Sequence, residues 1–314
     1  MRARRIHSPR APWCGRRRRG CGILGKGAVR GLTGGIANRM ELADTGIRES
    51  LEPGLLRLPS LEQFSVRLAF STRKGGVSAR PYDTLNLGLS VGDDPAAVHE
   101  NRRRFFTALG LDPSRIVRVR QVHGNDVLVV DRALAGQARF PRLLLDDDYL
   151  YDAIVTDLAG LGLAISTADC LPIFIVDPRH RAVGAVHAGW RSSVKGVVEH
   201  ALRTMGGVYG TDPAQCYAAL GPGIRGCCYE VDQPVMTAVH RACKEWQACV
   251  APAGRDRWML DLARLNIALL HGGGLSPDRI IDTGLCTACR SDLFYSYRAE
   301  KLKTGRMMSL IALL

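Results

Sequence analysis

The sequence predicts an α/β protein: a layered sandwich in which helices flank a mixed β-sheet, built as a single domain. Short apolar runs rich in Val and Ile, typical of buried strands, alternate with longer segments whose apolar residues recur at helical spacing. The strands and helices interleave without an internal repeat, which favours a layered fold over a solenoid.

The first predicted elements are one strand and one helix. Residues 64–70 form a short apolar run typical of a strand. Residues 95–109 carry apolar side chains at helical spacing, and Asp93 or Asp94 can cap this helix just before Pro95.

The later elements follow the same two patterns. Strands are predicted at residues 117–122, 127–130, 162–167, 171–177, 182–186 and 306–313. Helices are predicted at residues 194–205, 235–246 and 262–270, with the first ended by Gly206 and Gly207 and the last by the glycines at 272–274.

Length and charge indicate how the chain is divided. The net charge of +13 comes mostly from residues 1–39, which hold eleven Arg and Lys residues and no acidic residue, leaving 32 basic against 30 acidic residues elsewhere. We therefore predict a basic, disordered leader over residues 1–55 and one domain over residues 56–314. An extension from an upstream start, with Met40 as a second start, is favoured over a transit peptide or a nucleic-acid-binding arm.

Cysteine usage and hydropathy predict a cytoplasmic protein. The ten cysteines do not form a disulfide framework, and no run of about 18 apolar residues predicts a membrane span. Cys286 and Cys289 have the spacing of a zinc or redox pair, but no second such pair lies nearby in the sequence. They are interpreted as two buried thiols in a turn.

Three short motifs place a metal-binding side chain at the end of a predicted strand. They are R-Q-V-H-G-N-D at residues 120–126, S-T-A-D-C-L-P at 166–172 and A-V-H-A-G-W-R at 185–191. Their candidate ligands are His123, Cys170 and His187, which supply three donors for zinc and leave a fourth position open; copper is the less favoured metal. The alternative is that Cys170 is a small core residue and both histidines are buried for packing.

Further motifs occur in a fixed order with these three: T-R-K-G-G-V-S at residues 72–78, L-N-L-G at 85–88, E-N-R at 100–102, F-Y-S-Y-R at 294–298 and T-G-R-M at 304–307. From about residue 60 to 314 the chain resembles the laccase-domain family, also called multicopper polyphenol oxidases and peptidoglycan editing factors. Its members are now regarded as purine nucleoside phosphorylases.

The resemblance implies an enzyme that acts on a purine nucleoside and phosphate. The expected substrates are adenosine, inosine, guanosine and 5′-methylthioadenosine, and adenosine deaminase activity is implied as well. Such an enzyme is expected as a monomer or homodimer, without nucleic acid or membrane as a partner.

Several residues beside the ligands are candidates for the chemistry. Arg73 lies beside two glycines whose amides can approach an anion, so we predict that it binds phosphate and acts in catalysis. Arg191, next to His187, and Asn86 are further predicted substrate-binding residues. Cys170 is predicted to be catalytic as well as a ligand, and Asp169 to transfer a proton or orient a ligand imidazole, with capping of a turn as its alternative role.

One position departs from the family pattern. The family usually reads H-A-G-W-R-G, whereas Ser192 follows Arg191 in this chain. If this position requires a positive φ, Ser192 strains the loop and changes the fit of substrate.

Three other functions compete with this one. The first is a cysteine hydrolase acting on peptidoglycan-related fragments, with Cys170 as nucleophile and His187 or His123 as base. The second is a copper-dependent polyphenol oxidase, which is disfavoured because the chain has only eight histidines and no H-x-H pair. The third is a non-enzymatic binder that uses the basic N-terminal arm.

Overall fold

The computed structural model of the chain describes residues 48–50, 54–137, 140, 149–301 and 303–314. Most of the predicted leader therefore lies outside the described residues. The described part begins with strand β1, Arg48–Ser50, which pairs with β2, Leu55–Arg57. This pairing places sheet structure before residue 56, where the domain was predicted to begin.

Two six-stranded mixed sheets form the centre of the molecule. The first has the order β1-β2-β3-β15-β7-β4, in which only the β4–β7 pair is parallel. Its remaining strands are β3, Val66–Ser71; β15, Met307–Leu313; β7, Gly162–Thr167; and β4, Ile116–Val117.

The second sheet has the order β14-β10-β8-β9-β6-β5, with parallel pairs at its two edges. Its strands are β14, Ile280–Asp282; β10, Tyr217–Leu220; β8, Leu171–Asp177; β9, Ala182–Ala188; β6, Ala153–Thr156; and β5, Val127–Val129. A separate three-stranded sheet joins β11, Glu230–Asp232; β13, Arg257–Leu260; and β12, Val250–Gly254.

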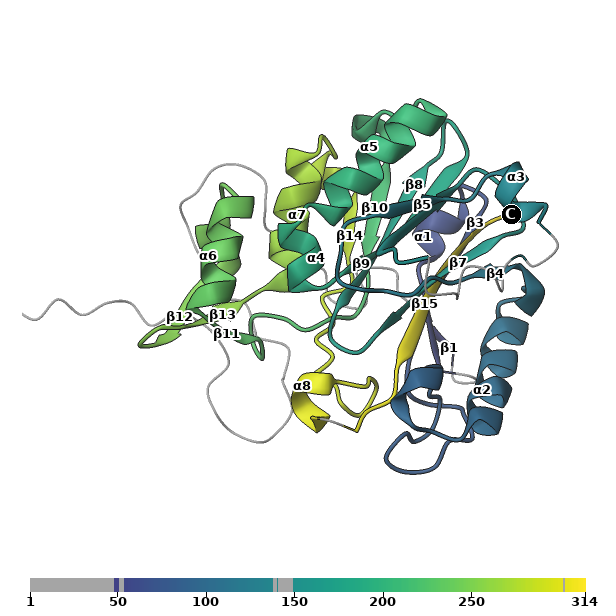
Figure 1. Ribbon diagram of the computed structural model, residues 1–314, viewed down its shortest axis with the longest axis horizontal. Coiled ribbons are helices and arrows are strands. Elements are labelled where there is room, and N and C mark those ends of the chain that lie inside the picture. Colours follow the sequence, from purple (N-terminus) through teal and green to yellow (C-terminus); the bar gives the residue numbers. More distant parts are fainter. Residues whose placement is uncertain (1–47, 51–53, 138–139, 141–148, 302) are drawn as a thin grey trace, which may run out of the picture.

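The two large sheets pack face to face, and helices cover their outer faces. Phe70 of the first sheet and Phe174 of the second meet in the core between them, with ring centroids 5.7 Å apart. Helix α2, Pro95–Ala108, packs Phe105 against the outer face of the first sheet. Helices α5, Val197–Tyr209, and α7, Leu262–Gly272, cover the second sheet, so the molecule has a helix–sheet–sheet–helix arrangement (Figure 1).

The other helices are short or lie at the periphery. They are α1, Pro59–Glu62; α3, Arg132–Ala135; α4, Trp190–Val194; α6, Gln233–Ala242; and α8, Tyr297–Glu300. Figure 1 shows α6 with the three-stranded sheet projecting from one side of the sandwich. No helix in the described ranges is long and apolar enough to cross a membrane.

The predicted fold class is confirmed, but four details differ. The strands divide between two large sheets, whereas a single mixed sheet was predicted. Residues 194–205 belong to two helices, α4 and α5, because Gly196 adopts a φ of 79° between them. Helix α5 continues through the predicted stop at Gly206 and Gly207 and ends before Gly210, whose φ of 75° is typical of a helix C-cap. The predicted strand at 117–122 is wrong beyond Val117, since the following residues form the loop that carries His123.

Candidate metal centre and active site

The structure brings the three predicted metal ligands together. His123 lies in the loop after β4, Cys170 in the turn between β7 and β8, and His187 in β9. Because β8 and β9 are paired with Pro172 opposite His187, the turn that carries Cys170 lies beside His187. The candidate ligand atoms all lie within 4.8 Å of one another, and Cys170 Sγ is 3.7 Å from His123 Nε2.

This separation suits a shared zinc ion. Zinc binds thiolate sulfur at about 2.3 Å and imidazole nitrogen at about 2.0 Å, so tetrahedral geometry places the two donors about 3.5 Å apart. His123 and Cys170 are partly exposed whereas His187 is buried, so the cluster is accessible from one side. Three protein donors with access from solvent are typical of a catalytic rather than a structural zinc site.

The backbone at the cluster is held in unusual conformations. His123 has a φ of 59° and Asp169 a φ of 92°, and non-glycine residues rarely adopt such angles without support from their surroundings. A Cβ atom at Gly189 would lie 2.9 Å from both Cys170 Sγ and His123 Cδ2. A glycine is therefore needed there for the two ligands to approach each other.

Asp152 organises both histidines and was not identified from the sequence. Its Oδ1 atom accepts hydrogen bonds from His187 Nδ1 at 2.7 Å and from the backbone N–H of His123 at 3.0 Å. Its Oδ2 atom accepts from the backbone N–H groups of Val122 and Gly124. Since Nδ1 of His187 is bonded to Asp152, its Nε2 atom remains for a metal. The only sequence signal was an acidic residue directly before the apolar strand β6.

Without a metal, the thiol and the buried imidazole polarise each other. Burial alone would raise the pKa of Cys170, but the charge of His187 and hydrogen bonds from both histidines lower it to about 6. Burial would lower the pKa of His187, but the charge of Cys170 and the bond to Asp152 raise it to about 9. A thiolate is therefore available near neutral pH, which is the form of cysteine that binds metals and acts as a nucleophile.

Asp169 lies beside the cluster with both oxygens engaged. Its Oδ1 accepts hydrogen bonds from the hydroxyls of Thr287 and Ser296, and its Oδ2 accepts one from the backbone N–H of Arg298. Burial nevertheless raises the pKa of Asp169. Asp169 was predicted to transfer a proton or to orient a ligand imidazole. The carboxylate that orients the imidazole of His187 is that of Asp152.

The predicted phosphate ligand Arg73 is already engaged with the protein. Its guanidinium forms an ion pair with Glu300, lies 3.7 Å from Asp83 and stacks on the ring of Tyr295 at 4.5 Å. Its side chain is only 11% exposed. To bind phosphate, Arg73 has to exchange one of these carboxylates for the anion.

Three further arginines lie around the cluster. Arg191 is exposed and stacks on Trp190 at 4.4 Å, and Arg298 stacks on Tyr229 at 4.8 Å. Arg306 is partly buried and close enough to Cys170 and Asp169 to interact with their charges. Among the described residues, no carboxylate lies within ion-pairing distance of Arg306, whose side chain donates only to backbone carbonyls. Arg306 lies in the T-G-R-M motif, which gave no sign of a role for this side chain.

Asn86 has a structural environment. It is fully buried, and its amide group donates to the backbone oxygen of Gly88 and to Asp93. Its oxygen accepts from the backbone N–H groups of Gly88 and Arg306. These bonds occupy the hydrogen-bonding positions of the side chain, so Asn86 holds Arg306 in place rather than facing solvent.

The strain proposed for Ser192 is absent. Ser192 lies within helix α4 and is not among the residues with positive φ, so this position does not require glycine. Its hydroxyl is buried and has no hydrogen-bond partner in the described part of the chain.

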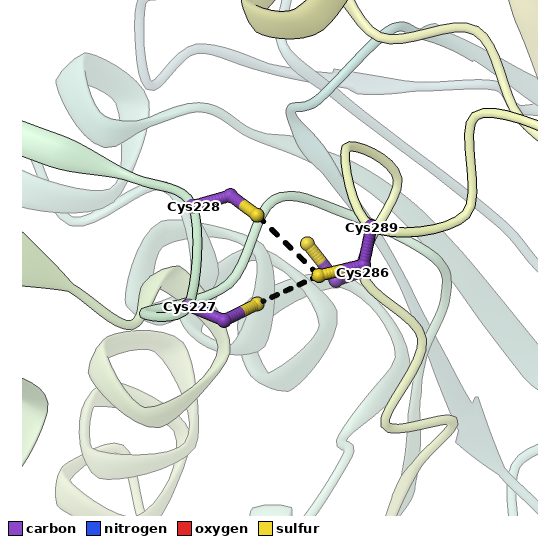
Figure 2. A group of neighbouring side chains, drawn as sticks. All are labelled: Cys227, Cys228, Cys286 and Cys289. Atoms are coloured by element: carbon purple, nitrogen blue, oxygen red, sulfur yellow. Dashed lines mark hydrogen bonds between the residues drawn. The ribbon is translucent and has the colours of Figure 1, made fainter. Parts of the chain in front are cut away.

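A second cluster corrects the interpretation of Cys286 and Cys289. The structure places Cys227 and Cys228 against them, so the turn holds four converging thiols rather than two isolated ones (Figure 2). Cys227 and Cys228 lie 62 and 61 positions before Cys289 in the sequence, so local spacing does not reveal that the two pairs meet.

The fold and the first cluster define the class of the protein: a two-sheet α/β protein with a histidine–cysteine–histidine centre open to solvent. A family model described as multi-copper polyphenol oxidoreductase laccase matches residues 67–314. The chain belongs to this family, as its motifs indicated.

Relatives and solved structures agree with this assignment. The chain is 37% identical over 245 residues to purine nucleoside phosphorylase YlmD of Bacillus subtilis, covering 78% of this chain and 87% of the relative. It is 40% identical over 264 residues to a purine nucleoside phosphorylase of Deinococcus radiodurans, covering 83% and 94%. The crystal structure of the hypothetical protein YfiH of Bacillus licheniformis has a TM-score of 0.79 at 31% identity, covering 86% and 99%.

Proposed function

We propose that this chain is a zinc-dependent purine nucleoside phosphorylase that also deaminates adenosine. The observation that carries the proposal is the open cluster of His123, Cys170 and His187. It occurs in a chain whose relatives are named purine nucleoside phosphorylase. The proposed substrates are adenosine, inosine, guanosine and 5′-methylthioadenosine.

Phosphorolysis needs an anion site beside the sugar. An oxygen of phosphate forms a bond to C1′ while the bond from C1′ to the purine nitrogen breaks, giving ribose 1-phosphate and the free base. Positive side chains must therefore hold phosphate against the developing positive charge of the sugar. Arg73 and Arg191 remain our predicted ligands, and Arg306 joins them because it interacts with the charges at the site and lacks a carboxylate partner among the described residues.

The departing purine has to gain a proton. Asp169 is the proposed proton carrier, because it adjoins Cys170 and because burial raises its pKa. A carboxyl group whose pKa is raised holds a proton at higher pH and can donate it to a leaving group. The bonds from Thr287 and Ser296 fix the orientation of this carboxyl group.

Deamination needs an activated water. Zinc held by the three ligands would act as a Lewis acid that lowers the pKa of water toward about 7. Addition of water at C6 of adenine followed by loss of ammonia converts adenosine to inosine. Asp152 contributes by fixing the tautomer of His187 that leaves Nε2 for the metal.

A cysteine hydrolase is the second candidate, and one observation favours it. The lowered pKa of Cys170, the contact with His187 and the bond from His187 to Asp152 together resemble a nucleophile, a base and an orienting acid. A copper oxidase is supported less, since the only cluster in the described residues that contains histidine has two of them.

The experiment that tests the proposal is a product assay. The purified protein is incubated with adenosine, with and without phosphate, and adenine, inosine and hypoxanthine are resolved by chromatography. We expect adenine only with phosphate, and inosine in both incubations. Arg73→Ala should depress adenine formation far more than inosine formation, because only phosphorolysis uses the anion. Failure of the wild-type protein to form either product would refute the proposal.

A further inference from the structure

The second cluster consists of Cys227, Cys228, Cys286 and Cys289, on two loops far apart in the sequence. The first pair lies between β10 and β11, and the second follows β14. All four sulfur atoms lie within 4.8 Å of one another. Figure 2 shows the four side chains pointing from the two loops toward one common point.

The distances between the sulfurs suit a shared metal ion. Cys289 Sγ lies 3.3 Å from Cys227 Sγ and 3.4 Å from Cys228 Sγ. A disulfide bond would bring two sulfurs to about 2.05 Å, whereas four thiolates around one zinc ion lie about 3.8 Å apart. The two observed distances are shorter than this zinc geometry by about 0.4 to 0.5 Å.

The backbone holds the two loops together independently of the sulfurs. Gly223 and Cys286 form a parallel bridge, and the N–H of Thr287 donates to the carbonyl of Gly223. The buried Arg225 pairs with both oxygens of Asp282 and donates to the carbonyl of Leu285. The thiols therefore converge on a scaffold that is already in place, which lowers the cost of binding a metal.

The turns also direct the thiols to one side. The N–H groups of Cys228 and Tyr229 both donate to the carbonyl of Arg225, and the N–H of Arg290 donates to the carbonyl of Cys286. The second of these turns contains the C-x-x-C spacing that is common in zinc sites with four cysteine ligands.

We propose that Cys227, Cys228, Cys286 and Cys289 bind a second zinc ion in a closed, structural site. Four sulfur donors fill the coordination sphere of zinc, so this site has no position for substrate. It differs in this respect from the cluster of two histidines and one cysteine, and the proposal does not depend on the reaction that the first cluster catalyses.

The second zinc ion would fix two loops that support the active site. Thr287, next to Cys286, donates to Asp169, and Ile224 donates its N–H to the carbonyl of Asp169. A metal that ties the loops together therefore holds Asp169 beside Cys170. We expect its loss to loosen this contact and lower the melting temperature.

Metal analysis of the purified full chain tests the proposal. We expect about two zinc ions per chain in the wild-type protein and about one in Cys286→Ser, since three thiolates bind more weakly than four. Cys170→Ala should also hold about one, because it loses only the first site. Cys216→Ser is the matched control, since Cys216 is buried and belongs to neither cluster, and it should keep both ions. Equal zinc in Cys286→Ser and the wild type would overturn the proposal, as would disulfides among these four cysteines with no metal bound.

A second measurement covers the case in which Cys286→Ser fails to fold. Zinc is removed from Cys170→Ala and replaced with Co²⁺. The absorption spectrum of bound Co²⁺ shows whether its ligands are thiolates and whether its geometry is tetrahedral. We expect intense thiolate-to-cobalt charge-transfer bands and the visible bands of tetrahedral cobalt. A spectrum without these bands, at full protein recovery, would overturn the four-cysteine site.

Discussion

Asp152 is the residue on which the geometry of the candidate metal centre depends most. It accepts hydrogen bonds from one ligand imidazole and from three successive backbone N–H groups of the loop that carries the other. This loop includes His123 at a positive φ, so the carboxylate stabilises a conformation that the chain would otherwise avoid.

Asp152→Asn should therefore weaken zinc binding at the first site by about 10-fold to 100-fold, the usual effect of losing a partner of a metal-binding histidine. Competition with a chelator measures this affinity. The matched control is Asp177→Asn, because Asp177 also accepts from a histidine, His180, and from backbone N–H groups, but at the other end of β8. The control should lose stability and keep its zinc affinity. Equal zinc affinity in Asp152→Asn and the wild type would contradict the role of Asp152.

Two neighbouring serines in α4 show how hydrogen bonding decides what a buried hydroxyl group contributes to stability. The hydroxyl of Ser192 is buried without a partner in the described residues, whereas that of Ser193 bonds to Asn266 and to the carbonyl of Gly189. Ser192→Ala should leave the free energy of unfolding unchanged or raise it by up to about 1 kcal/mol. Ser193→Ala should lower it by about 2 kcal/mol, because the amide of Asn266 loses a partner. Urea unfolding compares the two, and an equal loss in both variants would show that Ser192 has a partner.

At the scale of elements, helix α2 supports the loop that carries Arg73 and Asn86. Asn101, fully buried on this helix, accepts from the N–H of Val77. Its amide group donates to Ser78 and to the backbone oxygens of Thr84 and Asn86. One helix side chain therefore ties residues 77 and 78 of this loop to residues 84 and 86.

Asn101→Ala should lower the free energy of unfolding by about 3 kcal/mol, because it leaves several buried backbone groups unpaired. Chemical denaturation measures the loss. His99→Ala is the control, since His99 is exposed on the same helix and its removal should change stability by less than about 0.5 kcal/mol. A loss below 1 kcal/mol in Asn101→Ala would show that the loop is held by other contacts.

The elements that the sequence predicted well are those whose signals are local. Helix α2 begins after Asp94, whose side chain accepts from the N–H of Ala96, as the capping pattern predicted. Strands β7 and β8 have the predicted bounds because each is a continuous apolar run bordered by polar residues. Helix α5 was misjudged because a glycine within a helix and a glycine that ends one look alike without their φ angles.

The site residues that were predicted correctly also have local sequence signals, whereas those that were missed depend on long-range contacts. His123, Cys170 and His187 were found because each stands in a distinctive short motif at a strand end. Asp152 was missed because its partners lie 28 to 35 positions away in the sequence. The pairing of β6 with β9 brings Asp152 close to His187, and the sequence does not show this pairing. Asn86 was predicted to contact substrate, but four hydrogen bonds within the protein define its surroundings, and no sequence pattern reports these.

At the scale of the whole molecule, the two-sheet arrangement depends on long-range pairing. Strand β15, at the end of the chain, lies between β3 and β7. It pairs with β3, more than 200 residues earlier, and with β7, 140 to 150 residues earlier. Apolar periodicity identified these strands, but it contains no information on which strands pair. The same arrangement brings the end of β7, the start of β8 and the end of β9 together, and the candidate metal centre lies there.

The dependence of activity on zinc at the first site is the decisive property of the proposed zinc enzyme. Phosphorolysis and deamination of adenosine are followed while zinc is removed by a chelator and then restored, with Cys170→Ala as the variant that lacks this site. We expect both activities to fall with the metal, to return when zinc is added back, and to be absent from Cys170→Ala although it keeps the second ion. Full turnover by metal-free wild-type protein would contradict a zinc enzyme and would favour Cys170 as a nucleophile that works without metal.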